Sequence, residues 1–416
     1  MERAELSEAL RPWRSRGPSV QSGAPTFIME AQPEKFMTAF ADAVAGSGEI
    51  FLGNPAWGET ERASWAALRM AAVGTTPASG LPLGWLGIPT GGTSGQLKFA
   101  RHDHETLSAA VRGFAQHFGL TQVNAVGVLP LYHVSGLMAW LRCALTGGTY
   151  LAWDWKALEG GGRPVLPARA EGWLLSLVPT QLERLLSSDG AVAWLRQFRI
   201  IFIGGAPARP DLLEQAAALR LPLSLGYGMT ETAAMVTALR PEDFLAGARH
   251  SGAALPHATL KLGSDGVIKI ESASLFRGYF PAWREVAAFE TTDAGVQPAP
   301  GQWQILGRRD AMIITGGEKV SPVEVEAVLL GSGALRDVVV IGVPDAEWGQ
   351  RVVAAYPDSE RPNLAKLAAV ITQLLAPAQR PKQFVPLVSW PVSTVGKVNR
   401  AAVAEMVSQK LASSRR

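Results

Sequence analysis

Four runs of the 416-residue sequence combine glycines with charged side chains, and two of them also contain hydroxyl-bearing residues. The first run is Thr90-Gly91-Gly92-Thr93-Ser94-Gly95-Gln96-Leu97-Lys98. Its glycines would let the backbone approach a ligand closely, and its hydroxyl and backbone N–H groups could donate to phosphate oxygens, with Lys98 adding positive charge. The run is not a Walker loop, because two residues separate its last glycine from the lysine. Alone, it is equally compatible with a surface turn.

The second run, Gly226-Tyr227-Gly228-Met229-Thr230-Glu231-Thr232, lies just beyond a predicted strand at Leu221–Leu225. Ligands of parallel α/β sheets bind at the ends of strands. Thr230 could hydrogen-bond a phosphate, Glu231 could hold Mg²⁺ through its oxygens, and Tyr227 could lie against a base. A floor of small residues would lie beside them, formed by Gly204, Gly205, Ala206 and Pro207. The alternatives are that Glu231 starts a helix and that the glycine pair is a strand-to-helix turn.

Two further runs lie in the last third of the chain. They are Gly307-Arg308-Arg309-Asp310, followed by Gly316-Gly317, and Gly396-Lys397-Val398-Asn399-Arg400. Ser321 and Glu324, with Pro322 between them, match the start of a helix, so this part of the sequence also has a purely structural explanation. Taken singly, Lys397 would be a solvated surface lysine.

The elements that must position these residues alternate between short apolar strands and helices. The predicted strands are Ala125–Leu129, Thr149–Trp153, Trp173–Val178, Ile200–Ile203 and Leu221–Leu225. Helices are predicted between them, including Leu137–Leu145. Alternation of this kind indicates a largely parallel sheet covered by helices. A hairpin is predicted over Ala258–Leu262 and Gly266–Glu271, and a small α+β unit from Asp310 onward. We therefore predict an α/β protein with a large N-terminal domain (1–309) of mainly parallel covered sheets plus a small β-subdomain, followed by a small α+β C-terminal domain (310–416).

Composition narrows the class of protein. The chain is 47% apolar and 18% charged, which is typical of a folded globular protein. Its net charge is only +3, with basic residues scattered, which argues against a nucleic-acid binder. A single cysteine, Cys143, excludes a disulfide framework and multi-cysteine metal sites, and suits a reducing compartment. The apolar stretch Ala125–Leu145 is interrupted by Pro130, His133, Gly136 and Arg142, so we expect no membrane span and a cytoplasmic protein.

Together and in this order, the four runs resemble the signature of the acyl-adenylate-forming superfamily, which includes acyl-CoA synthetases, luciferases and peptide-synthetase adenylation domains. The family's T-S-G-T-T-G-x-P-K loop matches Thr90–Lys98 with departures at Gly91, Ser94 and Leu97, and Y-G-M-T-E matches Tyr227–Glu231 in full. T-G-D matches Thr291–Asp293 with a departure at Thr292. G-R-x-D matches Gly307–Asp310, and G-K-x-x-R matches Gly396–Arg400.

The resemblance implies an enzyme that uses ATP, Mg²⁺ and CoA to convert a carboxylic acid into its thioester. Asp293 and Arg308 would hold the ribose, and Asp310 would be the hinge of a mobile C-terminal domain. Lys397, Lys98, Thr230 and Mg²⁺ on Glu231 would stabilise the charge that moves during adenylation, since such transfers depend on positioning and electrostatics. Gly316 and Gly317 would lie beside the pantetheine arm.

Two segments are similar to the o-succinylbenzoate–CoA ligases of menaquinone and phylloquinone synthesis. They are Leu129–Leu137 (LPLYHVSGL) and Tyr227–Leu239 (YGMTETAAMVTAL). This similarity would place His133 and Ser135 at the acid, with His133 also in a catalytic role. A dicarboxylic acid needs a second anion site, for which Arg142 is our candidate, although an arginine in such a helix is more commonly a surface residue.

Three rival functions follow from the same residues. They are a ligase for another aryl or medium-chain acid, a stand-alone adenylation enzyme that loads a carrier protein, and a non-catalytic AMP or acyl sensor. Retention of Lys98 and Lys397 argues against the sensor. The expected partners are small molecules, with a homodimer possible in addition.

Overall fold

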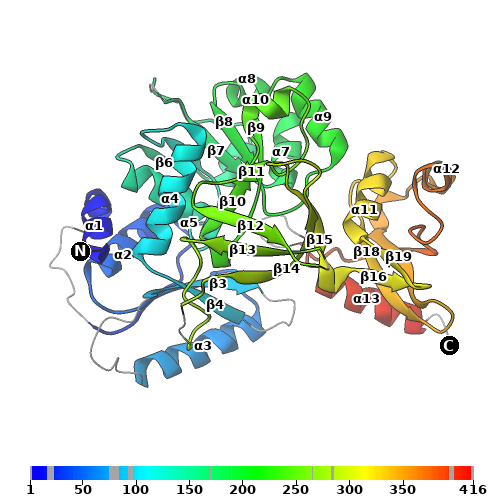
Figure 1. Ribbon diagram of the computed structural model, residues 1–416, viewed down its shortest axis with the longest axis horizontal. Helices are drawn as coiled ribbons and strands as arrows, with labels where there is room; N and C mark the ends of the chain where they lie inside the picture. The colour runs from blue at the N-terminus through cyan, green and yellow to red at the C-terminus, as the bar shows by residue number, and fades with distance from the viewer. Residues whose placement is uncertain are drawn as a thin grey trace.

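The computed structural model describes residues 2–15, 23–74, 84–91, 97–168, 171–188, 190–264, 266–282, 285–392 and 398–413 (Figure 1). The predictions for Gly92, Thr93, Ser94, Gly95 and Lys397 lie outside the described residues.

The largest sheet has seven strands in the order β11-β10-β9-β8-β7-β5-β6. Strands β5 to β9 pair in parallel, whereas β10 and β11 are antiparallel additions at one edge. The strand bounds are β5 Ala125–Gly127, β6 Tyr150–Ala152, β7 Leu174–Leu177, β8 Ile200–Ile203, β9 Leu223–Met229, β10 Ala234–Ala238 and β11 Ala253–Ala254.

Helices cover both faces of this sheet, because alternate residues of the buried strands point to opposite sides. In β8, Ile200 and Phe202 pack in one apolar cluster with helices α4 (His104–Phe118) and α5 (Val134–Leu145). Ile201 and Ile203 pack in a second cluster on the other face. The helices of that face are α7 Pro179–Leu186, α8 Ala191–Leu195, α9 Pro210–Ala218 and α10 Pro241–Leu245, with α6 Trp155–Glu159 at the edge.

Two smaller sheets complete the part of the chain before residue 310. The first has the order β1-β2-β3-β4 and is formed by β1 Thr26–Ile28, β2 Ile50–Leu52, β3 Leu86–Gly91 and β4 Leu97–His102, with helices α1 Glu2–Ala9, α2 Pro33–Ala45 and α3 Glu59–Gly74. The second is an antiparallel meander of β12 Ala258–Leu262, β13 Val267–Ser272, β14 Phe289–Val296 and β15 Gln304–Arg308.

The elements after residue 310 gather at one end of the molecule, yellow to red in Figure 1. A five-stranded sheet is formed by β16 Ile313–Thr315, β17 Glu318–Val320, β18 Val339–Asp345, β19 Gly349–Pro357 and β20 Gln383–Leu387. Helices α11 (Pro322–Gly331) and α12 (Leu364–Leu374) share one apolar cluster with it, and α13 (Arg400–Ser413) shares a second. As predicted, Ser321 begins α11, its hydroxyl accepting from the Glu324 N–H.

The predicted α/β class is confirmed, and most predicted elements agree with the structure to within a few residues. One prediction about the site is wrong: Tyr227 to Met229 do not lie beyond a strand but form the end of β9. Pairing with β10 satisfies their backbone groups, which the glycine-rich sequence does not reveal. The helix predicted from Leu137 begins three residues earlier, at Val134.

Candidate functional site

The flanks of the first glycine-rich run form a β-hairpin. Thr90 in β3 pairs with Lys98 in β4, so the two side chains are held opposite each other by the strand register. The Thr90 hydroxyl donates to Oε1 of Glu231 at 3.2 Å. The Lys98 ammonium lies 5.4 Å from the centre of the Tyr279 ring. The hairpin therefore joins the first predicted run to the second.

Glu231 lies in a short 3₁₀ helix, η2 (Thr230–Thr232), that directly follows β9. Its side chain is buried, and Oε1 also accepts from the Tyr279 hydroxyl at 2.7 Å. The prediction missed Tyr279, for which the only local signal is the preceding Gly278, at φ 93°. Two hydroxyl donors thus orient one carboxylate, leaving it suited to hold a hard cation together with phosphate oxygens.

A second residue that the prediction missed, His102, hydrogen-bonds the backbone of Thr230. Its Nε2–H donates to the Thr230 carbonyl oxygen at 2.8 Å, and its Nδ1 lies 3.1 Å from the Thr106 hydroxyl. Burial lowers the pKa of His102 to about 4, so the ring is neutral at physiological pH. A neutral ring that donates through Nε2 holds the Thr230 backbone without adding charge to the site.

Tyr227, Asp293 and Arg308 come together where β9 meets the meander. Asp293 in β14 is directly opposite Arg308 in β15. The Tyr227 hydroxyl donates to Oδ2 of Asp293 at 2.6 Å. Burial, and next the Asp293 charge, raise the pKa of Tyr227, so the phenol keeps its proton. Both residues predicted to hold a ribose therefore lie next to the predicted base-stacking tyrosine.

The predicted adenine loop and the predicted acid-binding residues lie at the end of strand β8 and at the start of helix α5, respectively. Gly204 to Pro207 follow β8 at the carboxyl edge of the parallel strands, with Gly205 at φ 81° and both Ala206 and Pro207 exposed. His133 is the N-cap residue of α5 and is half-buried, whereas Ser135 in the first turn is exposed. Parallel α/β sheets bind ligands at this edge.

Arg142 lies in the last turn of α5 and is only 4% exposed. The alternative of a helix-surface arginine is therefore wrong. Its guanidinium lies 3.9 Å from the centre of the Phe114 ring, and its Nε has no hydrogen-bond partner among the described residues. Burial lowers the pKa of Arg142 to about 10. Such a buried cation is costly unless an anion joins it.

His257 lies near Arg142 and is equally unsatisfied. Both of its ring nitrogens are buried and lack a hydrogen-bond partner in the described part of the chain. Burial, and next the Arg142 charge, lower the pKa of His257 to about 4. Gly113 makes room for this ring, because a Cβ there would come within 1.9 Å of Nδ1. Arg142 and His257 together form a buried cluster of nitrogen atoms without hydrogen-bond partners among the described residues. A carboxylate could accept hydrogen bonds from such a cluster.

The remaining predicted residues lie at and after residue 310. Asp310 lies in the 3₁₀ helix η3 (Arg309–Ala311), between the meander and the C-terminal sheet. Gly316 and Gly317 form the turn between β16 and β17, with φ 58° and 84°. A Cβ on Gly316 would come within 2.9 Å of the Trp348 ring, so glycine is required for this close approach.

Within the described residues, no cluster of three or more His, Cys, Asp or Glu side chains could hold a metal ion by itself. A cation at Glu231 would therefore need oxygens from a ligand. None of the described helices is long and apolar enough to cross a membrane.

Comparison with known proteins identifies the family. The model of the AMP-binding enzyme family matches residues 86–280, and that of the AMP-binding enzyme C-terminal domain matches residues 324–397. The chain belongs to the AMP-binding enzyme family. The superfamily predicted from the four runs is thereby confirmed.

Relatives and solved structures of this family agree with the match. The chain is 30% identical over 325 residues to the 2-succinylbenzoate–CoA ligase of Enterococcus faecalis, covering 74% of this chain and 67% of the relative. The o-succinylbenzoate CoA synthetase of Bacillus subtilis, in complex with the acyl-adenylate intermediate OSB-AMP, superposes with a TM-score of 0.77 at 21% identity, covering 97% of this chain and 91% of that chain. A double mutant of that synthetase bound to the product analogue OSB-NCoA superposes with a TM-score of 0.59 at 21% identity, covering 97% and 92%.

Proposed function

We propose that this AMP-binding enzyme is an ATP-dependent acid–CoA ligase whose acid is 2-succinylbenzoate. The reaction is 2-succinylbenzoate + ATP + CoA to 2-succinylbenzoyl-CoA + AMP + pyrophosphate, which serves quinone biosynthesis. The observation that carries the choice of acid is the buried Arg142 side chain, whose Nε has no hydrogen-bond partner among the described residues. A second carboxylate on the substrate would supply that partner.

The geometry of α5 supports a dicarboxylic acid of this size. Arg142 lies nine residues after His133, which corresponds to about 13 Å along a helix. Helical side chains point back toward the N-terminus, so the guanidinium reaches toward the His133 end. We propose that His133 and Ser135 contact the reacting end of the acid and that Arg142 binds the distal carboxylate.

In the first step, a carboxylate oxygen of the acid attacks the α-phosphorus of ATP and pyrophosphate leaves. We assign Thr90, Lys98, Thr230 and the segment 91–95 to the phosphates, with Lys397 stabilising the negative charge that develops in the transition state. Asp293 and Arg308 would hold the ribose. The adenine would lie between Tyr227 with Gly228 and the loop formed by Gly204, Gly205, Ala206 and Pro207.

Glu231 is the proposed ligand for Mg²⁺. Its carboxylate, oriented by Thr90 and Tyr279, fits the preference of this ion for one or two carboxylates plus substrate phosphates. When bound, Mg²⁺ would neutralise phosphate charge. In the second step, the CoA thiol attacks the acyl carbonyl, its proton is lost to solvent and AMP leaves, with Gly316 and Gly317 beside the pantetheine arm.

We further propose that residues 1–309 and 310–416 are separate domains and that the second rotates about Asp310 between the two steps. In support, the buried apolar clusters of the described residues have no member in common across residue 310. The higher TM-score with the OSB-AMP complex (0.77) than with the OSB-NCoA complex (0.59) supports an adenylate-forming orientation.

A cytoplasmic location is also proposed, since the single cysteine is buried and unpaired and the reaction needs a free thiol substrate. A homodimer stays a prediction, which analytical ultracentrifugation would test.

The substrate is tested with 2-succinylbenzoate, benzoate and octanoate in a pyrophosphate-release assay, with and without CoA, and by mass analysis of the products. We expect 2-succinylbenzoate to give the highest kcat/KM and an acyl-CoA product. If benzoate or octanoate does as well, the choice of acid is wrong. A product that stays acyl-AMP in the presence of CoA would instead favour an enzyme that loads a carrier protein.

A further inference from the structure

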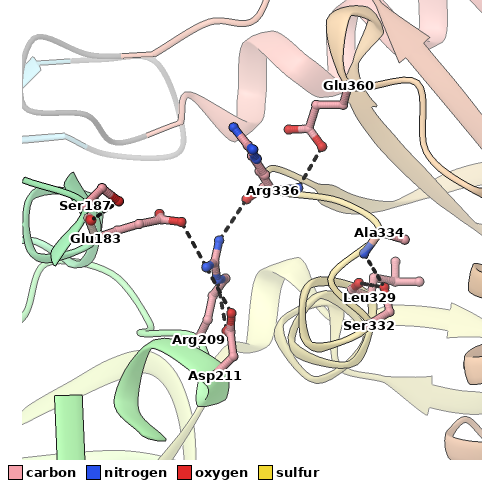
Figure 2. Close-up of polar contacts among 9 residues, drawn as sticks. All are labelled: Glu183, Ser187, Arg209, Asp211, Leu329, Ser332, Ala334, Arg336 and Glu360. Carbon is pink, nitrogen blue, oxygen red and sulfur yellow. Dashed lines mark hydrogen bonds and ion pairs between the residues drawn. The ribbon is translucent and has the colours of Figure 1, made fainter. Parts of the chain in front are cut away.

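The turn that connects α11 to β18 lies against the N-terminal domain, far along the chain from the proposed hinge. Figure 2 shows the contact: Nη1 of Arg209 donates to the backbone carbonyl oxygen of Arg336 at 3.3 Å. Arg209 immediately precedes α9, which contacts α11. One side chain of the N-terminal domain thus binds the backbone of the C-terminal domain directly.

The other nitrogens of Arg209 are occupied within its own domain. Nε and Nη2 donate to the two carboxylate oxygens of Asp211, at 3.1 and 3.0 Å. Nη2 also lies 2.9 Å from Oε1 of Glu183 in α7, and the arginine side chain is only 19% exposed. Because two carboxylates compensate its charge, Arg209 can release Arg336 without becoming an unpaired cation.

The carbonyl on the other side is held in place by its own turn. Glu360 accepts from the backbone N–H of Arg336 at 2.7 Å (Figure 2). It also accepts from the backbone N–H of Asp337 at 2.8 Å. The Ser332 hydroxyl closes the start of the same turn through the Ala334 N–H at 3.1 Å. The acceptor of Arg209 is therefore a rigid feature of the C-terminal domain.

Arg209 also compensates negative charge at this contact. Asp337 is half-buried beside Glu183, and burial, and next the Glu183 charge, raise the pKa of Asp337, while Arg209 and Arg184 act in the opposite direction. Without Arg209, the charges of Glu183 and Asp211 would lose a compensating cation. The Glu183 carboxylate of the N-terminal domain would then act on Asp337 of the C-terminal domain with less opposition. Their repulsion would favour separation.

We propose that Arg209 is a positioning residue that clamps the C-terminal domain in the adenylate-forming orientation and releases it for the thioester step. The loop assigned to adenine ends at Pro207, two residues before Arg209, so the clamp lies directly beside the nucleotide site. This inference rests on the domain rotation in the proposed function. What it adds is the contact that biases the rotation.

The test measures the distance between the domains in the full-length protein. Spin labels on Gln116→Cys in α4 and Leu374→Cys in α12 report it by pulsed electron resonance, and Cys143, fully buried, stays unlabelled. Arg209→Ala should lower the ratio of the population at the wild-type distance to the population at other distances. The expected decrease is about 3- to 10-fold, which corresponds to the loss of one hydrogen bond. Arg249→Ala is the matched control, because Arg249 also pairs with a carboxylate, Glu214, and its hydrogen bonds among the described residues all stay within the N-terminal domain.

Two further measurements separate a clamp from a general loss of structure. Glu183→Gln in the Arg209→Ala background removes one of the repelling carboxylates and should restore part of the wild-type ratio. Acyl-AMP formation in Arg209→Ala should fall by the same factor of about 3 to 10, while thioester formation from pre-made acyl-AMP should not fall.

An unchanged distance ratio in Arg209→Ala, or an equal change in Arg249→Ala, would overturn the clamp. The distance measurement needs no substrate. If the wild-type protein failed to activate any acid, the proposed function would be wrong, yet the ratio would still decide whether Arg209 holds the domains.

Discussion

Replacing Arg142 by methionine should weaken the use of 2-succinylbenzoate and leave that of benzoate unchanged. Methionine has a similar length but no charge, so Arg142→Met removes the proposed partner of the distal carboxylate, which benzoate lacks. Hydrogen bonds to charged groups contribute about 1.5–3 kcal/mol, so kcat/KM for 2-succinylbenzoate should fall by about 10- to 100-fold.

The same substitution should stabilise the free enzyme. Burial lowers the pKa of Arg142 to about 10, and each pKa unit corresponds to about 1.36 kcal/mol, so folding disfavours the charged form by about 3 kcal/mol. Loss of the contact with the Phe114 ring offsets about 2 kcal/mol of this. We therefore expect the free energy of unfolding to rise by about 1 kcal/mol, measured by urea denaturation without ligand.

The assay compares kcat/KM for both acids in the wild type, Arg142→Met and the control Arg249→Met, whose arginine contacts Glu214 elsewhere. The ratio of the two kcat/KM values should change only in Arg142→Met. Equal losses with both acids would refute a role for Arg142 in recognising the second carboxylate. A clear decrease in the free energy of unfolding of Arg142→Met would refute the inference that the Arg142 charge destabilises the ligand-free enzyme.

Three other substitutions test the remaining roles. Lys397→Ala should lower acyl-AMP formation by about 10²- to 10³-fold and affect thioester formation from pre-made acyl-AMP much less; equal losses in both steps would contradict the domain rotation. Tyr279→Phe removes a hydroxyl donor to Glu231 and should raise the Mg²⁺ concentration for half-maximal rate by about tenfold, whereas a lower kcat at saturating Mg²⁺ with no such rise would contradict this role. The pKa of His102 is lowered to about 4 in the folded state, so its contribution to stability is complete above the unfolded value near 6.5 and is lost as the pH falls toward 4. Between pH 7 and 5 the wild type should lose about 2 kcal/mol more free energy of unfolding than His102→Gln, and equal losses would show that His102 does not titrate in this way.

The parts of the fold that could be predicted are those in which local sequence carries the signal. Ile200–Ile203 forms β8 with the predicted bounds, because four consecutive β-branched and aromatic residues suit a strand buried on both faces. The start of α5 was placed three residues late, because Val134-Ser135-Gly136 looks like a turn. Its helical backbone is stabilised by packing, since Gly136 lets the helix approach the backbone of Pro130.

The residues that could do chemistry were found because their order along the chain is specific, and the sequence by itself determined the family and the reaction class. Tertiary structure decided how they meet. Local sequence does not reveal that Arg142 is buried with no hydrogen-bond partner for its Nε in the described part of the chain. Nor does it reveal that Tyr279 orients Glu231 or that His102 holds Thr230. Tyr279 and Glu231 are 48 positions apart in the sequence, and His102 and Thr230 are 128 positions apart. Burial and long-range pairing depend on how sheets and helices pack, and Arg209, which reaches a backbone carbonyl 127 residues away, leaves no trace in its own sequence neighbourhood.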